Sequence, residues 1–160
     1  MDFQQRLDKA IERGQRIGTR RARTEAQRAL NEQELQRLHA QYRLELSERI
    51  ERCLGQVAER FPGFRFETLV GAQGWGAVIT RDDLKMQSGR RANLFSRLEM
   101  VIRPFSAARV VELAAKGTVQ NRELFNRTYF EELPDVDLEH FAELIDAWVI
   151  EYAEVFAARS

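Results

Sequence analysis

The sequence has one cysteine, three prolines and nine glycines among its 160 residues. One cysteine excludes a disulfide framework and a zinc site built from cysteines, and so few prolines and glycines exclude a collagen-like chain. The chain has no apolar run near the ~20 residues of a membrane span, and its start has no apolar stretch of the signal-peptide kind. Hydrophobic residues at 44% are enough for a packed core. We therefore expect a cytoplasmic protein of one domain, with or without an appendage, and no membrane contact.

Lysine is also scarce, and the charge is uneven along the chain. Of the 25 basic residues only Lys9, Lys85 and Lys116 are lysines. Residues 1–61 carry 13 basic and 10 acidic residues, residues 62–130 carry 11 and 6, and residues 131–160 carry 1 and 9, so net charges of +3, +5 and −8 cancel. The acidic last segment either packs on the basic body of its own chain or meets another copy, unless the solvated helix faces merely differ in sign.

The first third of the chain has the pattern of a long helix, straight or kinked. Between residues 24 and 61 there is no proline, and Pro62 marks the end of the helix. Apolar residues recur at steps of three and four and form one stripe, here called the central stripe: Leu35, Leu38, Tyr42, Leu46, Ile50, Cys53, Val57 and Phe61. Before it, residues 1–13 form a short helix with Phe3, Leu7 and Ile11 on one side, and residues 14–23 are a hinge or the start of the long helix.

Such a helix is too long for a compact domain of this size. Residues 24–61 would extend about 55 Å, whereas the radius of gyration of a compact 160-residue domain is ~15 Å. The central stripe therefore packs on the chain's own sheet or pairs with another chain. Its average spacing of about 3.7 residues is closer to an eleven-residue than a seven-residue repeat. That spacing favours a short antiparallel or nearly straight helix pair, or a small bundle.

The pattern changes after residue 61 and predicts an α+β fold. Alternating residues indicate strands near 64–70, 75–81, 94–103 and 109–116, with a polar connection beginning at residues 81–83. Residues 118–133 either extend the fourth strand past a bulge at Gly117 or contain a helical turn. Short connections favour an antiparallel sheet of about four strands. Asp137 caps an amphipathic C-terminal helix that packs on one sheet face. We expect a helical extension over 1–61 and an α+β domain over 62–160.

For each possible catalytic or metal-binding motif in the sequence, a purely structural role is the better explanation. Gly71, Gly74 and Gly76 precede a strand rather than a helix, so they fit a hairpin turn better than a phosphate-binding loop. His140 has only carboxylates beside it on a polar helix face, a thin set of metal ligands. Cys53 lies on the central stripe, where it acts as a small apolar residue. We predict no cofactor and no metal, and we favour a non-enzymatic protein while an enzyme stays open.

Three arginines form the only candidate anion site in the sheet. Arg65, Arg97 and Arg103 lie on its outer face together with glutamates, and cross-strand ion pairs explain that face without a ligand. The Arg-rich stretch 16–28 is a second basic surface. Nucleic-acid binders are usually basic overall, whereas this chain has a pI of about 6.8.

The function best supported by the sequence is a non-enzymatic interaction or assembly module. Its N-terminal helix would contact a second copy or a protein partner through these residues of the central stripe: Leu35, Leu38, Tyr42, Leu46 and Ile50. The alternative is a binder of an anionic small molecule or nucleic acid through the arginine-rich surfaces.

Overall fold

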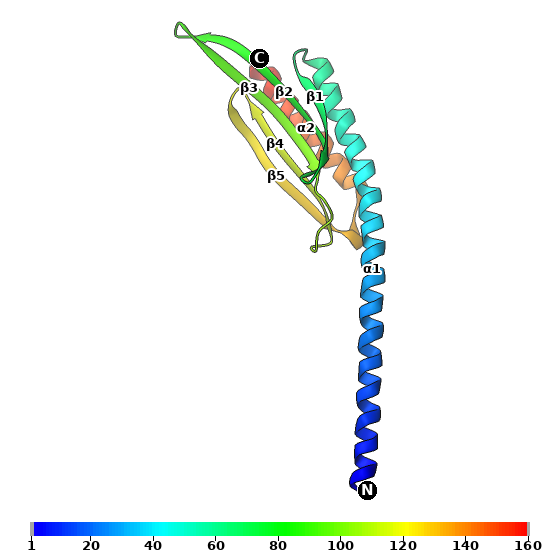
Figure 1. The fold of residues 1–160 in the computed structure, drawn as a ribbon. Coiled ribbons are helices and arrows are strands. Elements are labelled where there is room, and N and C mark those ends of the chain that lie inside the picture. The colour runs from blue at the N-terminus through cyan, green and yellow to red at the C-terminus, as the bar shows by residue number, and fades with distance from the viewer. Residues whose placement is uncertain (1, 160) are drawn as a thin grey trace. The chain divides into compact units, whose positions relative to one another are not determined.

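A computed structural model describes residues 2–159, apart from the side chains of residues 27, 29, 30 and 87. Its elements in chain order are α1 (Phe3–Arg60), β1 (Arg65–Gly71), β2 (Gly74–Gln87), β3 (Arg90–Ile102), β4 (Val110–Val119), β5 (Arg122–Glu132), a 3-10 turn (Leu133–Asp135) and α2 (Leu138–Arg159), as Figure 1 shows. This is the expected α+β fold, with five strands instead of about four. By its contacts the chain divides into residues 1–37 and residues 38–160.

Helix α1 begins at Phe3 and continues through both glycines of its first half. The expected hinge or helix start within residues 14–23 is therefore wrong. Two isolated glycines cost about 1 kcal/mol each, and good helix formers such as Arg, Gln, Glu and Ala surround them. The Asp2 carboxylate accepts a hydrogen bond from the Gln5 amide at 2.9 Å and caps the first turn. The helix ends before Pro62, as expected.

The five strands form an antiparallel meander in the order β1-β2-β3-β4-β5. The tight turn between β2 and β3 is made by Ser88 and Gly89, with φ of 52° and 75°, and the turn between β4 and β5 by Gln120 and Asn121, with φ of 47° and 69°. Two consecutive residues with positive φ are typical of hairpin turns that match the twist of a sheet. Residues 118–133 are thus the end of β4, after a register shift at Gly117, and a fifth strand.

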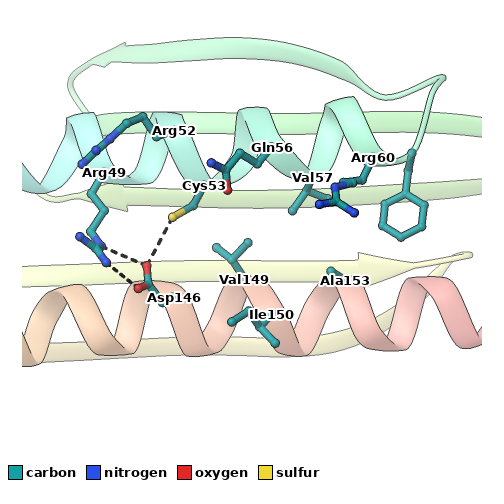
Figure 2. A pocket seen from close by; sticks show the side chains of 11 residues that line it. Arg49, Arg52, Cys53, Gln56, Val57, Arg60, Asp146, Val149, Ile150 and Ala153 are labelled. Atoms are coloured by element: carbon teal, nitrogen blue, oxygen red, sulfur yellow. Dashed lines mark hydrogen bonds and ion pairs between the residues drawn. The ribbon is translucent and has the colours of Figure 1, made fainter.

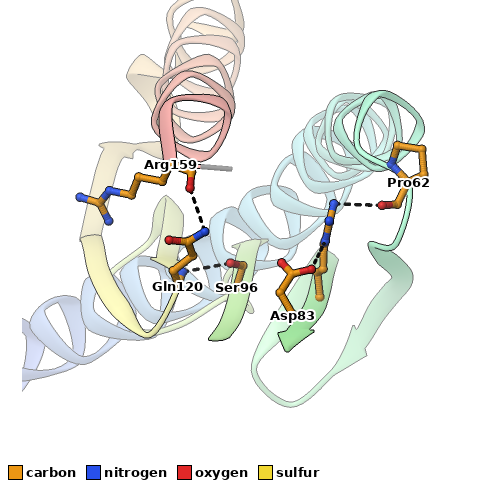
Figure 3. Close-up of polar contacts among 6 residues, drawn as sticks. Pro62, Asp83, Ser96, Gln120 and Arg159 are labelled. Carbon is orange, nitrogen blue, oxygen red and sulfur yellow. Dashed lines mark hydrogen bonds and ion pairs between the residues drawn. The ribbon is translucent and has the colours of Figure 1, made fainter. Parts of the chain in front are cut away.

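The polar connection expected at residues 81–83 is wrong, because these residues lie inside β2. Arg81 pairs with Ser96 and Asp83 with Leu94 in the ladder between β2 and β3. The Arg81 guanidinium donates to the Asp83 carboxylate at 3.0 Å and to the Pro62 carbonyl at 2.9 Å (Figure 3). An ion pair between two residues of one strand face allows charged side chains to continue a strand. Figure 3 also shows Gln120 linked to Ser96 and to the Arg159 carbonyl.

Helix α2 lies on one face of the sheet, as expected (Figure 1). Asp137 accepts hydrogen bonds from the amides of Glu139 and His140, at 3.1 and 3.3 Å, so the predicted cap is confirmed. Tyr152 is fully buried and donates to the Thr118 carbonyl of β4 at 2.8 Å. The core of residues 38–160 is completed by one apolar side of the second half of α1, which includes Leu46, Ile50, Leu54 and Val57.

The glycines before β2 belong to a hairpin, as predicted. Gly71 pairs with Gly74 at the end of the β1–β2 ladder. A Cβ atom added to Gly76 would lie 1.9 Å from the Met100 carbonyl oxygen, so β3 approaches β2 too closely there for any side chain. Within the described residues, no helix is long and apolar enough to cross a membrane.

Candidate interaction surfaces

The structure separates the predicted contact residues of the central stripe into two groups. Leu46 and Ile50 are 3% and 0% exposed and belong to the core of residues 38–160. Leu35, Leu38 and Tyr42 are partly exposed. An N-terminal contact would therefore involve residues of the second group and of the helix before them.

A second apolar stripe lies on the first half of α1. Phe3, Leu7 and Ile11 follow one another at steps of four and are 73%, 45% and 49% exposed. The same side of the helix continues at steps of three and four with small residues, so we call this whole set the terminal stripe: Phe3, Leu7, Ile11, Gly14, Gly18 and Ala22. No described atom lies within 4 Å of a Cβ built on Gly14 or Gly18, apart from their immediate helix surroundings. The helix backbone is thus accessible at both glycines.

Basic side chains line another side of the same helical segment. They recur at steps of three and four, and we call them the basic row: Arg6, Lys9, Arg13, Arg16, Arg20 and Arg23. All six residues of the row line one or both of two surface hollows, and Glu12 lines both hollows as well. At 100° per residue the basic row lies about 150° around the helix from the terminal stripe. The basic row and the terminal stripe therefore lie on different sides of the helix, and Arg21, five turns after Phe3, lies on the side of the stripe.

The three arginines of the outer sheet face do not converge. Arg65 and Arg97 both face Thr80, from opposite neighbouring strands, whereas Arg103 lies six residues beyond Arg97 along the chain, or roughly 20 Å for a strand. Arg97 forms an ion pair with Glu99 at 3.3 Å, and Arg103 forms one with Glu112 at 3.6 Å. Only the second of these is a contact between neighbouring strands of the expected kind, because Arg97 and Glu99 both belong to β3. One small anion does not reach all three guanidinium groups.

A hollow of residues 38–160 lies between α1 and α2. It has a volume of about 450 Å³, and Figure 2 shows its lining from the two helices. Its lining includes the apolar residues Val57, Val149 and Ile150 and the cations Arg52 and Arg60. Arg49 crosses it and binds both carboxylate oxygens of Asp146, at 3.0 and 2.5 Å. Sequence reasoning missed this groove because its two sides are about 97 residues apart in the chain.

The thiol at this groove is not activated. Cys53 donates to Asp146 at 3.4 Å. Burial, followed by the hydrogen bond and negative charge of Asp146, raises the pKa of Cys53 to about 11. The hydrogen bond from Arg49 lowers the pKa of Asp146, so this carboxylate is ionised at neutral pH. A protonated thiol is a poor nucleophile. Cys53 is nevertheless partly exposed and hydrogen-bonded to a carboxylate, so the prediction of a purely apolar role is wrong.

The two histidines occupy different environments. His39 is buried beside Phe105, and its Nε2 has no hydrogen-bond partner among the described atoms. Burial lowers the pKa of His39, with a smaller opposing contribution from the Arg103 backbone and a further lowering by Arg43. His140 lies against Tyr129, with 5.3 Å between the ring centroids. No group of three or more potential metal ligands occurs among the residues that the structure describes.

Compared with protein-family models, curated proteins and solved structures, the chain matches none.

Proposed function

We propose that the protein is a non-enzymatic assembly module that self-associates through the first part of α1. The observation that carries this proposal is the terminal stripe. Phe3, Leu7 and Ile11 line one side of the helix and are largely exposed. A contiguous apolar row of this kind is typical of a contact surface, whereas single exposed apolar residues are ordinary.

The energetics of an isolated helix support the same conclusion. Most helical stability in proteins comes from packing an apolar side rather than from intrinsic propensity. Residues 1–37 form a unit of their own by contacts, and the described side chains from residue 2 to residue 28 are all exposed. Gly14 and Gly18 each weaken the helix by about 1 kcal/mol. A second copy would supply the missing packing surface.

The size of the terminal stripe sets the expected affinity. Fully burying a Phe, Leu or Ile side chain gives ~1.5–3 kcal/mol, so three from each of two copies give about 9–18 kcal/mol. Association itself costs roughly 4–15 kcal/mol. The difference between the two ranges reaches at most about 14 kcal/mol, and a dissociation constant in the micromolar range, about 8 kcal/mol, lies within it.

The test is light scattering on the gel-filtration peak of the full chain, across about 5–200 µM to bracket that affinity. We expect a mass that rises with concentration, and a monomer after the double substitution Leu7→Glu and Ile11→Glu. The matched control, Gln5→Glu with Thr19→Glu, adds the same charge on the other side of the helix and should still associate. A wild-type protein that stays monomeric throughout, or two variants that behave alike, would contradict the proposal.

The partly exposed residues of the central stripe are a separate candidate contact surface. Leu35, Leu38 and Tyr42 remain proposed contact residues, whereas changes at Leu46 or Ile50 would act on the core of residues 38–160. Leu38→Glu alone is therefore the informative change in that stretch. If the central stripe binds a protein partner, Leu38→Glu should weaken that contact and leave the thermal unfolding of residues 38–160 nearly unchanged.

The basic row supports a second candidate function, binding along the phosphates of a nucleic-acid duplex. Five of its six residues are arginines, which bind phosphate in a forked geometry. Six cations over 18 residues extend along about 25 Å of helix. The segment has no aromatic residue among the row, so it lacks the stacking side chains of single-strand binders.

Fluorescence anisotropy with a labelled DNA duplex tests this second function. If all six cations contact phosphate, affinity should fall roughly 10³-fold between about 50 and 200 mM salt. Changing Arg13, Arg16 and Arg20 to Gln should reduce that fall to about 40-fold. The control changes three exposed arginines elsewhere, Arg60, Arg90 and Arg91, to Gln. Equal losses in the two triple variants, or no binding at low salt, would eliminate the row as a nucleic-acid site.

A further inference from the structure

The large and small side chains of the terminal stripe are arranged about its midpoint so that each large residue has a small counterpart. Its first three members are large and its last three are small: Phe3, Leu7 and Ile11, then Gly14, Gly18 and Ala22. The residue numbers add to 25 for Phe3 with Ala22, for Leu7 with Gly18 and for Ile11 with Gly14. Reversing the helix about a point between residues 12 and 13 therefore places every large residue where a small one was.

This arrangement fits a second copy in the antiparallel direction. In an antiparallel pair of identical helices, positions whose numbers have a constant sum lie at the same level. Each level would contain one large and one small side chain, one from each copy. Because Gly14 and Gly18 are open above their Cα atoms, Ile11 and Leu7 of the other copy can approach the backbone there. A parallel pair would instead place Phe3 on Phe3 and Gly18 on Gly18, so that three crowded levels are followed by three empty ones.

The spacing also determines the path of the pair. The second half of the terminal stripe repeats the first after eleven residues, because 3, 7 and 11 become 14, 18 and 22. Eleven residues in three turns is close to the natural period of the α-helix. Two such helices lie nearly straight against each other over the length of the stripe.

The charges of the segment favour the same direction. Residues 2–12 carry two basic and three acidic side chains, a net charge of −1, whereas residues 13–23 carry five arginines and no acid, a net charge of +5. A parallel pair aligns the two +5 halves along their length. An antiparallel pair aligns each +5 half with a −1 half, which removes most of this repulsion.

We infer that two copies of the chain associate as an antiparallel, two-fold symmetric helix pair centred between residues 12 and 13, with Phe3, Leu7 and Ile11 of each copy packed against Ala22, Gly18 and Gly14 of the other. This inference rests on the proposed self-association and specifies its partner, direction and register. It also leaves the basic rows of both copies on the outside of the pair, because the row and the stripe lie on different sides of the helix.

Disulfide trapping in the full chain tests direction and register. The natural thiol is first removed with Cys53→Ser, which keeps a hydrogen-bond donor for Asp146. One variant then carries Gln4→Cys and a second carries Ala22→Cys. These positions lie on the same flank of the stripe, and in the inferred pair they are one residue from the same level. Oxidation of a mixture of the two variants should give a covalent dimer, and neither variant alone should, because its two thiols are about 25 Å or more apart.

The controls separate this inference from the proposed function. One control is a mixture of Lys9→Cys and Arg16→Cys. These two residue numbers also add to 25, so the positions lie at the same level of the inferred pair, but on the side of the helix away from the contact. This mixture should not cross-link. Cross-linking of Gln4→Cys with itself would show a parallel pair and overturn the inference while self-association stands. A dimer by light scattering with no cross-link in any mixture would overturn the register. A monomer at all concentrations would remove both the inference and the proposed function.

Discussion

Replacing Ile50 with alanine tests the assignment of the second half of α1 to the core. Ile50 is 0% exposed and lies among the buried residues of α1. Large-to-small changes of this kind cost about 2–5 kcal/mol, and Ile→Val costs roughly 0.5–1.5 kcal/mol. We expect Ile50→Ala to lose about 3 kcal/mol and Ile50→Val about 1 kcal/mol of the free energy of unfolding. A loss of 3 kcal/mol is a large part of the roughly 5–15 kcal/mol that holds a domain together.

Urea unfolding followed by tryptophan fluorescence measures this loss, because Trp75 and Trp148 both lie within residues 38–160. The matched control is Leu44→Ala, an exposed position of the same helix, which should change the free energy by less than about 0.5 kcal/mol. The measurement is repeated over a range of protein concentrations.

Concentration dependence separates a core residue from an interface residue. A contact between copies contributes to stability by mass action, so its loss depends on protein concentration. A core contact contributes the same amount at every dilution. If Ile50→Ala matched Leu44→Ala, or if its effect disappeared on dilution, the assignment of Ile50 to the core would be refuted.

Three further predictions follow from buried groups. His39→Phe should reduce the loss of stability as the pH falls from about 7 to about 5. Burial lowers the pKa of His39 below its unfolded value near 6.5, so protonation favours the unfolded state in that window. Equal pH profiles of thermal unfolding for wild type and variant would contradict this. Gly76→Ala should cost about 1–3 kcal/mol or more by urea unfolding, because its Cβ would meet the Met100 carbonyl, while Gly71→Ala, with open space around it, serves as the control. Asp146→Asn should speed the reaction of Cys53 with a thiol reagent near pH 8, because the hydrogen bond and charge of Asp146 raise the pKa of that thiol; an unchanged or slower rate would show that burial alone protects it.

The sequence was sufficient for the fold because each element has a local pattern. Alternation predicted β1, β3 and β4, the Asp137 cap predicted the start of α2, and Pro62 predicted the end of α1. The error at residues 81–83 arose because two aspartates usually indicate a turn, whereas the Arg81 side chain neutralises Asp83 within the strand. The fifth strand was left open because the register shift at Gly117 breaks its alternation.

The candidate surfaces were less accessible to sequence reasoning. One periodic stripe is compatible with a core and with an interface, and periodicity alone does not say where one becomes the other. Leu38 and Leu46 have the same chemistry and lie on the same helix, but only Leu46 is buried by the sheet domain. The terminal stripe was recognisable only in part, because Phe3, Leu7 and Ile11 are apolar whereas Gly14 and Gly18 have no side chain to signal a contact.

The charge gradient along the chain distinguishes two modes of association. Within residues 38–160 the acidic last segment already pairs with basic side chains, as Arg49 binds Asp146 and Arg127 binds Glu151. These pairs support packing of the segment on its own body. If other acidic residues of this segment bound basic residues of a second copy, added salt would weaken association, because it would screen the attraction between the opposite charges. The antiparallel pair behaves in the opposite way, because residues 2–23 carry a net charge of +4 in each copy and repel as a whole. Its apolar levels are insensitive to screening, so added salt should strengthen the dimer.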